Sequence, residues 1–193
     1  MCDFKEMLLK NTVIAAIRSE AELQKVLTYD INIVFVLYGS ILDIKDICDR
    51  LRVKNKIVFV HVDMIEGLKS DSKGIEYIKR LANPYGIIST KLSNIKYAHN
   101  LGLKTVQRVF IIDSQSLNTG INNIHTAMPH AVEVMPGVAS KIIKIIQKDI
   151  NLPIIAGGLI HDRRDILDSI NAGAVSISTS DENLWNFEQD KLY

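Results

Sequence analysis

Residues 152–160, LPIIAGGLI, pass from a short apolar run into two adjacent glycines, and residues 172–180, AGAVSISTS, pass from a second apolar run into a cluster of hydroxyls. Each run has the length and the β-branched content of a buried strand. The segment between them carries a helix start signal, Asp162, and a stop signal, Gly173. The order strand, helix, strand predicts two parallel strands joined by a helical crossover.

The same unit recurs along the whole chain. Between the apolar runs, hydrophobic residues repeat at spacings of three and four, which predicts helices. Eight alternating units, at about 24 residues each, predict an α/β protein: a small, single-domain (β/α)8 barrel over residues 1–193. The alternative is an open doubly wound sheet, but no GxGxxG follows the first strand. The expected strands are 12–17, 32–38, 56–63, 85–90, 104–111, 131–135, 152–157 and 174–179.

The composition is that of an ordinary globular protein, with 47% hydrophobic and 23% charged residues. No apolar run approaches the roughly 20 residues that span a bilayer, and the N-terminus lacks the positive region of a signal peptide. We therefore expect a cytoplasmic protein, with Cys2 and Cys48 as reduced thiols. The formal charge of +1 gives no overall attraction to nucleic acid, so RNA binding would need a local basic patch.

The last two predicted strands carry the residues expected to bind phosphate. In barrels of this type the loops after the carboxyl ends of the final strands often form a phosphate site. Gly157 and Gly158 would bring backbone amides to an anion without interference from a Cβ. Ser178, Thr179 and Ser180 would add hydroxyls beside the start of a following helix. Singly, the glycines fit a tight turn and the hydroxyls a helix cap; together they predict a phosphate site.

Charged residues lie in or directly after four other strands, namely Arg18, Asp63, Lys91 and Glu133. Arg18 would bind an anion or form an ion pair with Asp63 or Glu133. The two acids would face each other across the barrel mouth, for acid–base chemistry or for hydrogen bonds from ligand hydroxyls. Lys91 would bind phosphate, form a Schiff base, or stand solvated at a helix start.

Three further features have mainly structural interpretations. His61 shares a strand face with Asp63, as two metal ligands would, but no third ligand has matching spacing; we expect a packed, hydrogen-bonded histidine and no metal site. Trp185 is expected to anchor the last segment in the core. The stretches 65–74 and 114–123 are expected to be loops that become ordered around a ligand.

Eight motifs lie at the predicted strand ends along nearly the whole chain, namely AAIR, FVHVDMIEGL, GIISTK, QRVFIIDSQSL, NTGI, VEVMPGV, PIIAGGLI and AGAVSISTSDENLW. Together and in this order, they resemble the glycerol uptake operon antiterminator family, the glycerol-3-phosphate-responsive regulators of bacteria. The resemblance implies a barrel that binds glycerol 3-phosphate as its effector, without a required cofactor and without enzymatic activity. It also implies action on the leader mRNA of glycerol-utilisation genes, where the liganded protein prevents early termination.

The resemblance also assigns roles to individual residues. It implies that Gly157, Gly158, Ser178 and Thr179 form the phosphate loops. It implies that Arg18, Asp63 and Glu133 form the polar ring around the glycerol hydroxyls. No motif marks an RNA-contacting residue, and a homo-oligomer would be one way to assemble such a surface.

Two alternative functions remain open at this point. A barrel enzyme, an isomerase or lyase, would act on a small phosphorylated metabolite with Asp63, Glu133 and Lys91 as its reactive groups. A phosphate-binding barrel would also serve as a protein-interaction module. Turnover of a sugar phosphate would indicate the enzyme, and effector binding without RNA binding would indicate the interaction module.

Overall fold

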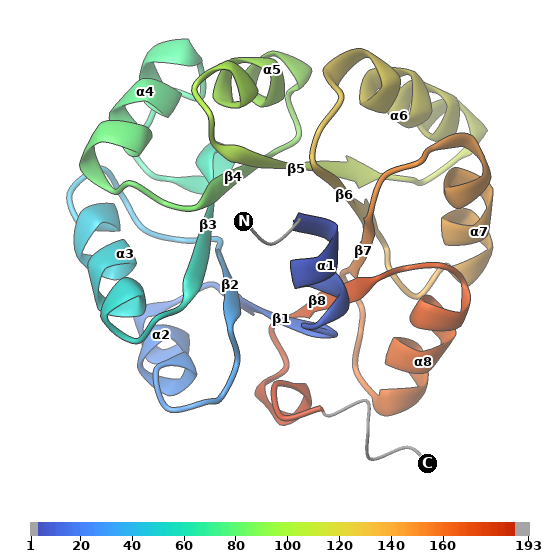
Figure 1. Ribbon diagram of the computed structural model, residues 1–193, viewed down its shortest axis with the longest axis horizontal. Coiled ribbons are helices and arrows are strands. Elements are labelled where there is room, and N and C mark those ends of the chain that lie inside the picture. Colours follow the sequence, from blue (N-terminus) through green and yellow to red (C-terminus); the bar gives the residue numbers. More distant parts are fainter. Residues whose placement is uncertain (1–3, 188–193) are drawn as a thin grey trace.

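The structure, a computed structural model, describes residues 4–187 and shows eight parallel strands that close into a barrel, surrounded by helices (Figure 1). Each strand pairs with the next in sequence, and β8 pairs with β1. The predicted (β/α)8 barrel is confirmed, with a strand inside each predicted range. The strands are β1 (Val13–Ile17), β2 (Ile33–Val36), β3 (Ile57–His61), β4 (Gly86–Ser89), β5 (Lys104–Phe110), β6 (Ala131–Met135), β7 (Ile154–Gly157) and β8 (Ser176–Thr179).

The helices begin at the carboxyl ends of the strands and end at the amino ends. Ser19 and Asp162 cap α2 and α8, because their side chains accept hydrogen bonds from the amides of Glu22 and Asp165. After the short α1 (Phe4–Leu9), the chain forms α2 (Glu20–Val26), α3 (Ile44–Val53), α4 (Ser72–Leu81), α5 (Leu92–Asn100), α6 (Ser114–Ala127), α7 (Ser140–Asp149) and α8 (Arg163–Asn171), with 3-10 turns η1 (Val62–Met64) and η2 (Glu182–Leu184).

The expectation of a loop over residues 114–123 is wrong. These residues form most of α6, which begins with a reciprocal capping box between Asp113 and Ser116. The polar Ser, Gln, Asn and Thr side chains of this stretch suggested a loop, but the caps and the packing of Ile124 onto the barrel stabilise a helix. Within residues 4–187, no helix is long and apolar enough to span a membrane.

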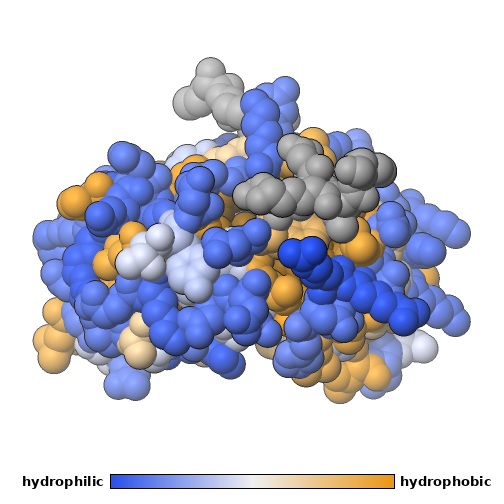
Figure 2. All heavy atoms as spheres, turned by 90° about the horizontal axis from the view of Figure 1, so that it is seen from below, coloured by the Kyte–Doolittle hydropathy of each residue, from blue (hydrophilic) through white to orange (hydrophobic). Residues whose placement is uncertain are grey.

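Alternation along the strands divides the core into two parts. One set of side chains fills the barrel lumen, among them Ile14, Phe35, Phe59, Val106 and Ile155. The other set packs between the strands and the helices, and it includes the free thiol of Cys48 and the ring of Trp185. The buried ring of Trp185 confirms its expected role as a core anchor, and Cys48 is a free cysteine, as expected. Cys2 lies outside the described residues. The face of the molecule shown in Figure 2 is mostly hydrophilic, with small hydrophobic patches.

A helix that the sequence pattern did not reveal closes the amino-terminal end of the barrel. This is α1 (Phe4–Leu9), which lies at the centre of the ring in Figure 1. Phe4 and Leu8 belong to the cluster of side chains in the lumen, and the rings of Phe4 and Phe59 are 5.7 Å apart. Ser176 Oγ donates a 2.8 Å hydrogen bond to the Leu8 carbonyl. The apolar side chains of α1 therefore close the lumen of the barrel at this end, while the lumen stays open at the carboxyl ends of the strands.

Candidate ligand pocket at the barrel mouth

A pocket of ≈ 530 Å³ opens at the carboxyl ends of the strands. This volume is in the range of small-molecule sites. The pocket brings together most of the residues proposed from the last two strands, along with Arg18 and Glu133. Its lining consists of Ala16, Arg18, Leu37, Met64, Arg108, Glu133, Met135, Gly158, Leu159, Ile160, His161, Ser178, Thr179, Ser180 and Asp181.

The loop after β7 presents bare backbone to this pocket. Gly158 and Leu159 both have positive φ, 76° and 59°, so successive peptide groups curl around one side. Outside the barrel ladder, the amides of Gly158, Leu159, Ile160 and Ser180 donate to no group of residues 4–187. Amides arranged in this way form a concavity that favours an anion.

The residues after β8 join this loop to the rest of the pocket. Thr179 Oγ1 donates to the Ile160 carbonyl at 3.1 Å and accepts from the Asp181 amide at 3.1 Å. Its hydroxyl proton therefore holds the two loops together. The hydroxyl of Ser180, in contrast, has no hydrogen-bond partner within residues 4–187 and lines the pocket. The following helix is the short turn η2, capped by Asp181.

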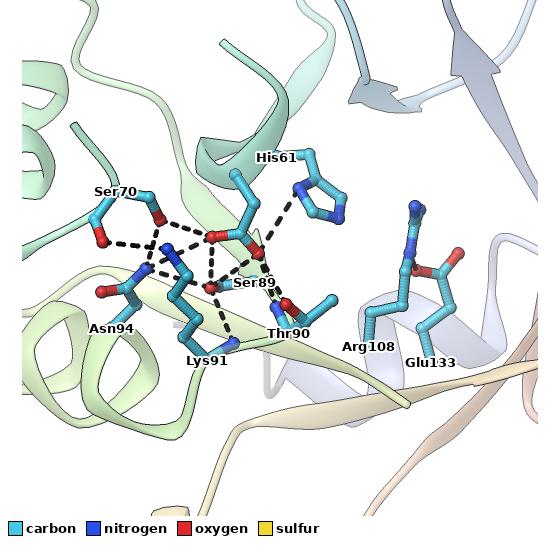
Figure 3. Close-up of polar contacts among 9 residues, drawn as sticks. His61, Ser70, Ser89, Thr90, Lys91, Asn94, Arg108 and Glu133 are labelled. Atoms are coloured by element: carbon cyan, nitrogen blue, oxygen red, sulfur yellow. Dashed lines mark hydrogen bonds and ion pairs between the residues drawn. The ribbon is translucent and has the colours of Figure 1, made fainter. Parts of the chain in front are cut away.

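A buried ion pair forms the floor of the pocket. Arg108 Nε donates to Glu133 Oε2 at 2.6 Å, and Ser178 Oγ donates to Glu133 Oε1 at 2.5 Å. Glu133 is 0% exposed and Arg108 is 7% exposed. The two residues are direct neighbours in the β5–β6 register, and Figure 3 shows the guanidinium beside the carboxylate. The Nη atoms of Arg108 donate to no group of residues 4–187, so the cation keeps donors for a ligand.

Arg108 is the site residue that sequence reasoning missed. Arg108 lies two residues after Val106 in β5, so its side chain points to the same face as that lumen residue. The available signal was a charged residue inside an otherwise buried strand, because such a charge requires a partner. Only the register shows that this partner is Glu133.

Gly157 makes room for the buried carboxylate and does not itself line the pocket. A Cβ at this position would lie 2.6 Å from Glu133 Oε1 and 2.7 Å from Ser178 Oγ. Both distances are far shorter than any normal contact. The glycine is therefore required for the Ser178–Glu133 hydrogen bond, which is a different reason from the one that the sequence suggested.

Arg18 lies at the rim of the pocket. Its side chain is 60% exposed, and the ion pair that it makes is with Glu22, at 3.8 Å. The alternative pairing with Asp63 or Glu133 is wrong, because Arg108 occupies the Glu133 carboxylate and hydroxyl and amide donors occupy Asp63. The exposed guanidinium is free to turn toward a bound anion.

Asp63 is the centre of a separate polar cluster beside the pocket. Its Oδ1 accepts from Ser70 Oγ at 2.5 Å and from Ser89 Oγ at 3.0 Å. Its Oδ2 accepts from the amide and the hydroxyl of Thr90, at 2.7 Å and 3.1 Å. Burial opposes the charge, but these hydrogen bonds outweigh it and lower the pKa of Asp63. The carboxylate ties the segment around Ser70 to the end of β4, and Asp63 does not line the pocket.

Lys91 belongs to this second cluster. Its Nζ donates to the Ser70 carbonyl at 3.3 Å, and its backbone stands at the start of α5 (Figure 3). This position agrees with the predicted alternative of an exposed residue at a helix start. The structure therefore brings Asp63 and Lys91 together with each other and not with Glu133.

His61 lies between the two clusters (Figure 3). It is 3% exposed, as expected for a packed histidine, but its Nδ1 makes no hydrogen bond within residues 4–187 and is 3.9 Å from Asp63 Oδ2. Burial and the nearby Arg108 charge lower the pKa of His61 to about 4, so the ring is neutral at pH 7. Within residues 4–187, no group of three or more His, Cys, Asp or Glu side chains is arranged to hold a metal ion.

Comparison with known proteins assigns this chain to a family. Residues 13–185 match the family described as glycerol-3-phosphate responsive antiterminator. The chain belongs to this family. It is 34% identical over 186 residues to the uncharacterized Escherichia coli (strain K12) protein YgcP, a match that covers 96% of this chain and 97% of YgcP. The resemblance inferred from the sequence motifs is thus confirmed.

Solved structures of antiterminator proteins have the same fold. The Listeria monocytogenes glycerol uptake operon antiterminator regulatory protein is 29% identical, with a TM-score of 0.89 over 92% of this chain and 96% of that one. A Thermotoga maritima antiterminator-related protein is 31% identical, with a TM-score of 0.82 over 92% and 99%. An aldolase, QR15, has a TM-score of 0.70 over 89% of this chain and 91% of its own, but at 14% identity that likeness concerns the fold alone.

Proposed function

We propose that this antiterminator-family protein senses glycerol 3-phosphate in the mouth pocket and that the liganded form acts on a leader transcript of glycerol-utilisation genes. The phosphate would accept hydrogen bonds from the amides of Gly158, Leu159 and Ser180, and from the Ser180 hydroxyl. Arg18 and the Nη atoms of Arg108 would add charge-assisted hydrogen bonds. The glycerol hydroxyls would face the polar floor near Glu133.

One observation carries this proposal: amide donors without a partner and a buried arginine with unused donors line the same pocket. Buried polar groups normally have hydrogen-bond partners, so unused donors that converge on a pocket favour an anionic ligand. The family description names a small organic phosphate of fitting size. The proposal requires no cofactor and no metal, and the cytoplasm, where glycerol 3-phosphate and transcripts meet, is the expected location.

The barrel-enzyme alternative has less support in the pocket. No lysine of residues 4–187 lines it, so a Schiff-base mechanism lacks its nucleophile. The carboxylate of Glu133 is held by Arg108 and Ser178, which leaves it poorly placed to move a proton. We therefore propose a regulator and not an enzyme.

Isothermal titration calorimetry tests the effector, with glycerol, inorganic phosphate and glyceraldehyde 3-phosphate as comparison ligands. We expect saturable binding of glycerol 3-phosphate that is much tighter than that of glycerol or phosphate alone, and no product after prolonged incubation. Consumption of a sugar phosphate would instead establish the enzyme. The absence of glycerol 3-phosphate binding would refute the assignment of the pocket.

Ser180 gives the sharpest variant for this titration. Its side chain makes no hydrogen bond within residues 4–187, so replacing it does not disturb the floor of the pocket. Ser180→Asp adds a negative charge next to the proposed phosphate and is expected to abolish binding, whereas the similarly sized, neutral Ser180→Asn should retain much of it. Equal affinities for the two variants would contradict a phosphate at this position.

A further inference from the structure

The amino-terminal end of the barrel carries a second pocket, of ≈ 780 Å³, on the face opposite the effector pocket. We call it the basal pocket. Four basic side chains line it, Arg52, Lys56, Lys79 and Lys104, and no Asp or Glu of residues 4–187 lines it. In a chain whose formal charge is only +1, this concentration of one sign is a local feature. The other lining residues are Phe4, Ile57, Val58, Asn83, Pro84, Tyr85, Gly102 and Leu103.

Helix ends explain only part of this charge. Helices of a (β/α)8 barrel end at this face, and basic residues in a last turn favourably complement the helix dipole. Arg52 and Lys79 stand in the last turns of α3 and α4. Lys56, however, precedes β3, and Lys104 is the first residue of β5. Their charges need another explanation.

Backbone carbonyl groups, and not carboxylates, accept the hydrogen bonds of the Lys56 and Lys79 side chains. Lys56 Nζ donates to the Tyr29 carbonyl at 2.6 Å, and Lys79 Nζ donates to the Leu101 carbonyl. Each ammonium group has three donors, so each keeps donors for an external anion. The ammonium group of Lys104 has no hydrogen-bond or ion-pair partner within residues 4–187, although its backbone amide donates to the Tyr85 carbonyl at 3.2 Å. Arg52 contacts Asp49 at 2.7 Å and also donates to the Ala82 carbonyl.

An aromatic ring lies among these cations. Tyr85 is 41% exposed, and its ring packs against Phe59, with centroids 5.6 Å apart, which fixes its orientation. A fixed aromatic face beside a basic groove is the combination that binds single-stranded nucleic acid, because bases stack on the ring while lysines contact phosphates. The mouth of the barrel differs, since aspartates cap several of the helices that start there, among them Asp71, Asp113 and Asp162.

We propose that the basal pocket is the surface that binds the single-stranded part of the transcript, with phosphates at Lys56, Lys79 and Lys104 and a base against Tyr85. This inference rests on the proposed function, because it takes RNA as the partner. It places the RNA and the effector at opposite ends of the barrel. The two ligands would therefore bind together and not compete.

Fluorescence anisotropy with a labelled single-stranded oligouridine tests this location, since the electrostatic part of RNA binding does not depend on sequence. Binding is measured over a series of salt concentrations, with and without saturating glycerol 3-phosphate. The slope of log K against log salt is negative, and each lost phosphate contact reduces its magnitude by about 0.7 for single strands. The double variant Lys56→Gln/Lys104→Gln should therefore bind more weakly and lose about 1.4 from the slope.

Two matched variants separate location from simple charge or misfolding. Arg163→Gln/Arg164→Gln removes the same charge at the start of α8, on the mouth face, and should leave the slope unchanged. Lys56→Arg/Lys104→Arg keeps the charge and should retain binding. Calorimetric binding of glycerol 3-phosphate by every variant shows that each is folded.

The outcomes distinguish this inference from the function on which it rests. Loss of RNA binding in the Arg163/Arg164 variant but not in the Lys56/Lys104 variant would overturn the basal location and leave transcript binding intact. Competition between RNA and effector would also overturn it. Failure of the liganded wild type to bind any single-stranded RNA, even at low salt, would refute both this inference and the transcript part of the proposed function, while effector binding would stand on its own titration.

Discussion

Replacing Glu133 with glutamine tests whether the floor of the effector pocket depends on a buried ion pair. The side chain keeps its shape and can still accept from Ser178 Oγ, but its charge is lost and an amide nitrogen can face the Arg108 Nε donor. Removing one partner of a buried pair costs about 3–5 kcal/mol, because the other charge remains buried without compensation. In a chain of this size, a loss of about 1 kcal/mol lowers Tm by about 2–4 °C. We therefore expect a decrease in Tm of roughly 6–20 °C.

Thermal unfolding followed by circular dichroism measures this decrease in Tm, with Glu182→Gln as the matched control. Glu182 forms an ion pair of similar length with Lys25, at 2.8 Å, but both side chains are exposed, 38% and 53%. Solvent screens that pair, so its loss should leave the unfolding midpoint unchanged. A midpoint for Glu133→Gln equal to that of the wild type would refute the reasoning that burial makes this pair indispensable.

Two further predictions concern Gly157 and His61. Gly157→Ala should displace Glu133 or Ser178, destabilise the protein by about 1–3 kcal/mol and weaken effector binding. Gly120→Ala is the control, because a Cβ there meets side chains only at 3.4 Å or more, and it should be neutral or stabilising. Urea midpoints and calorimetry compare the two variants, and equal effects would contradict the packing argument. The folded protein holds the pKa of His61 at about 4, below the usual 6.5, so the unfolded chain takes up the proton first on acidification. The contribution of His61 to stability should therefore fall by about 2 kcal/mol between pH 7 and pH 5. Burial also lowers the pKa of His130 to about 4, so His61→Gln should reduce, and not abolish, the slope of the urea-derived stability profile in this range.

The sequence alone determined the fold of this protein. Strand and helix signals are local, and eight repeats of them leave few arrangements other than a closed barrel. Two elements escaped this reasoning for physical reasons. The single short helix α1 offers too few residues for a periodic pattern, and the polar stretch that begins α6 owes its helical state to Asp113, Ser116 and the packing of Ile124.

The sequence also located the pocket to the ends of the last two strands, because parallel strands bring their carboxyl ends to one face. Gly158, Ser178, Thr179 and Ser180 indeed line one cavity. Local sequence could not predict how the charges pair, since pairing depends on register and on which strands meet. It therefore offered Asp63 and Glu133 as a facing pair.

Only the tertiary structure decided which charges share a site. Barrel closure and the β5–β6 register put Arg108 on Glu133, while the turn after β3 sends Asp63 to the hydroxyls of Ser89 and Thr90. The same closure gathers Lys56 and Lys104, 48 positions apart in the sequence (104 minus 56), into one basic pocket. Hydrophobic patterning acts over a few residues and fixes the elements, whereas electrostatic partners are chosen by distances that exist only after the barrel has closed.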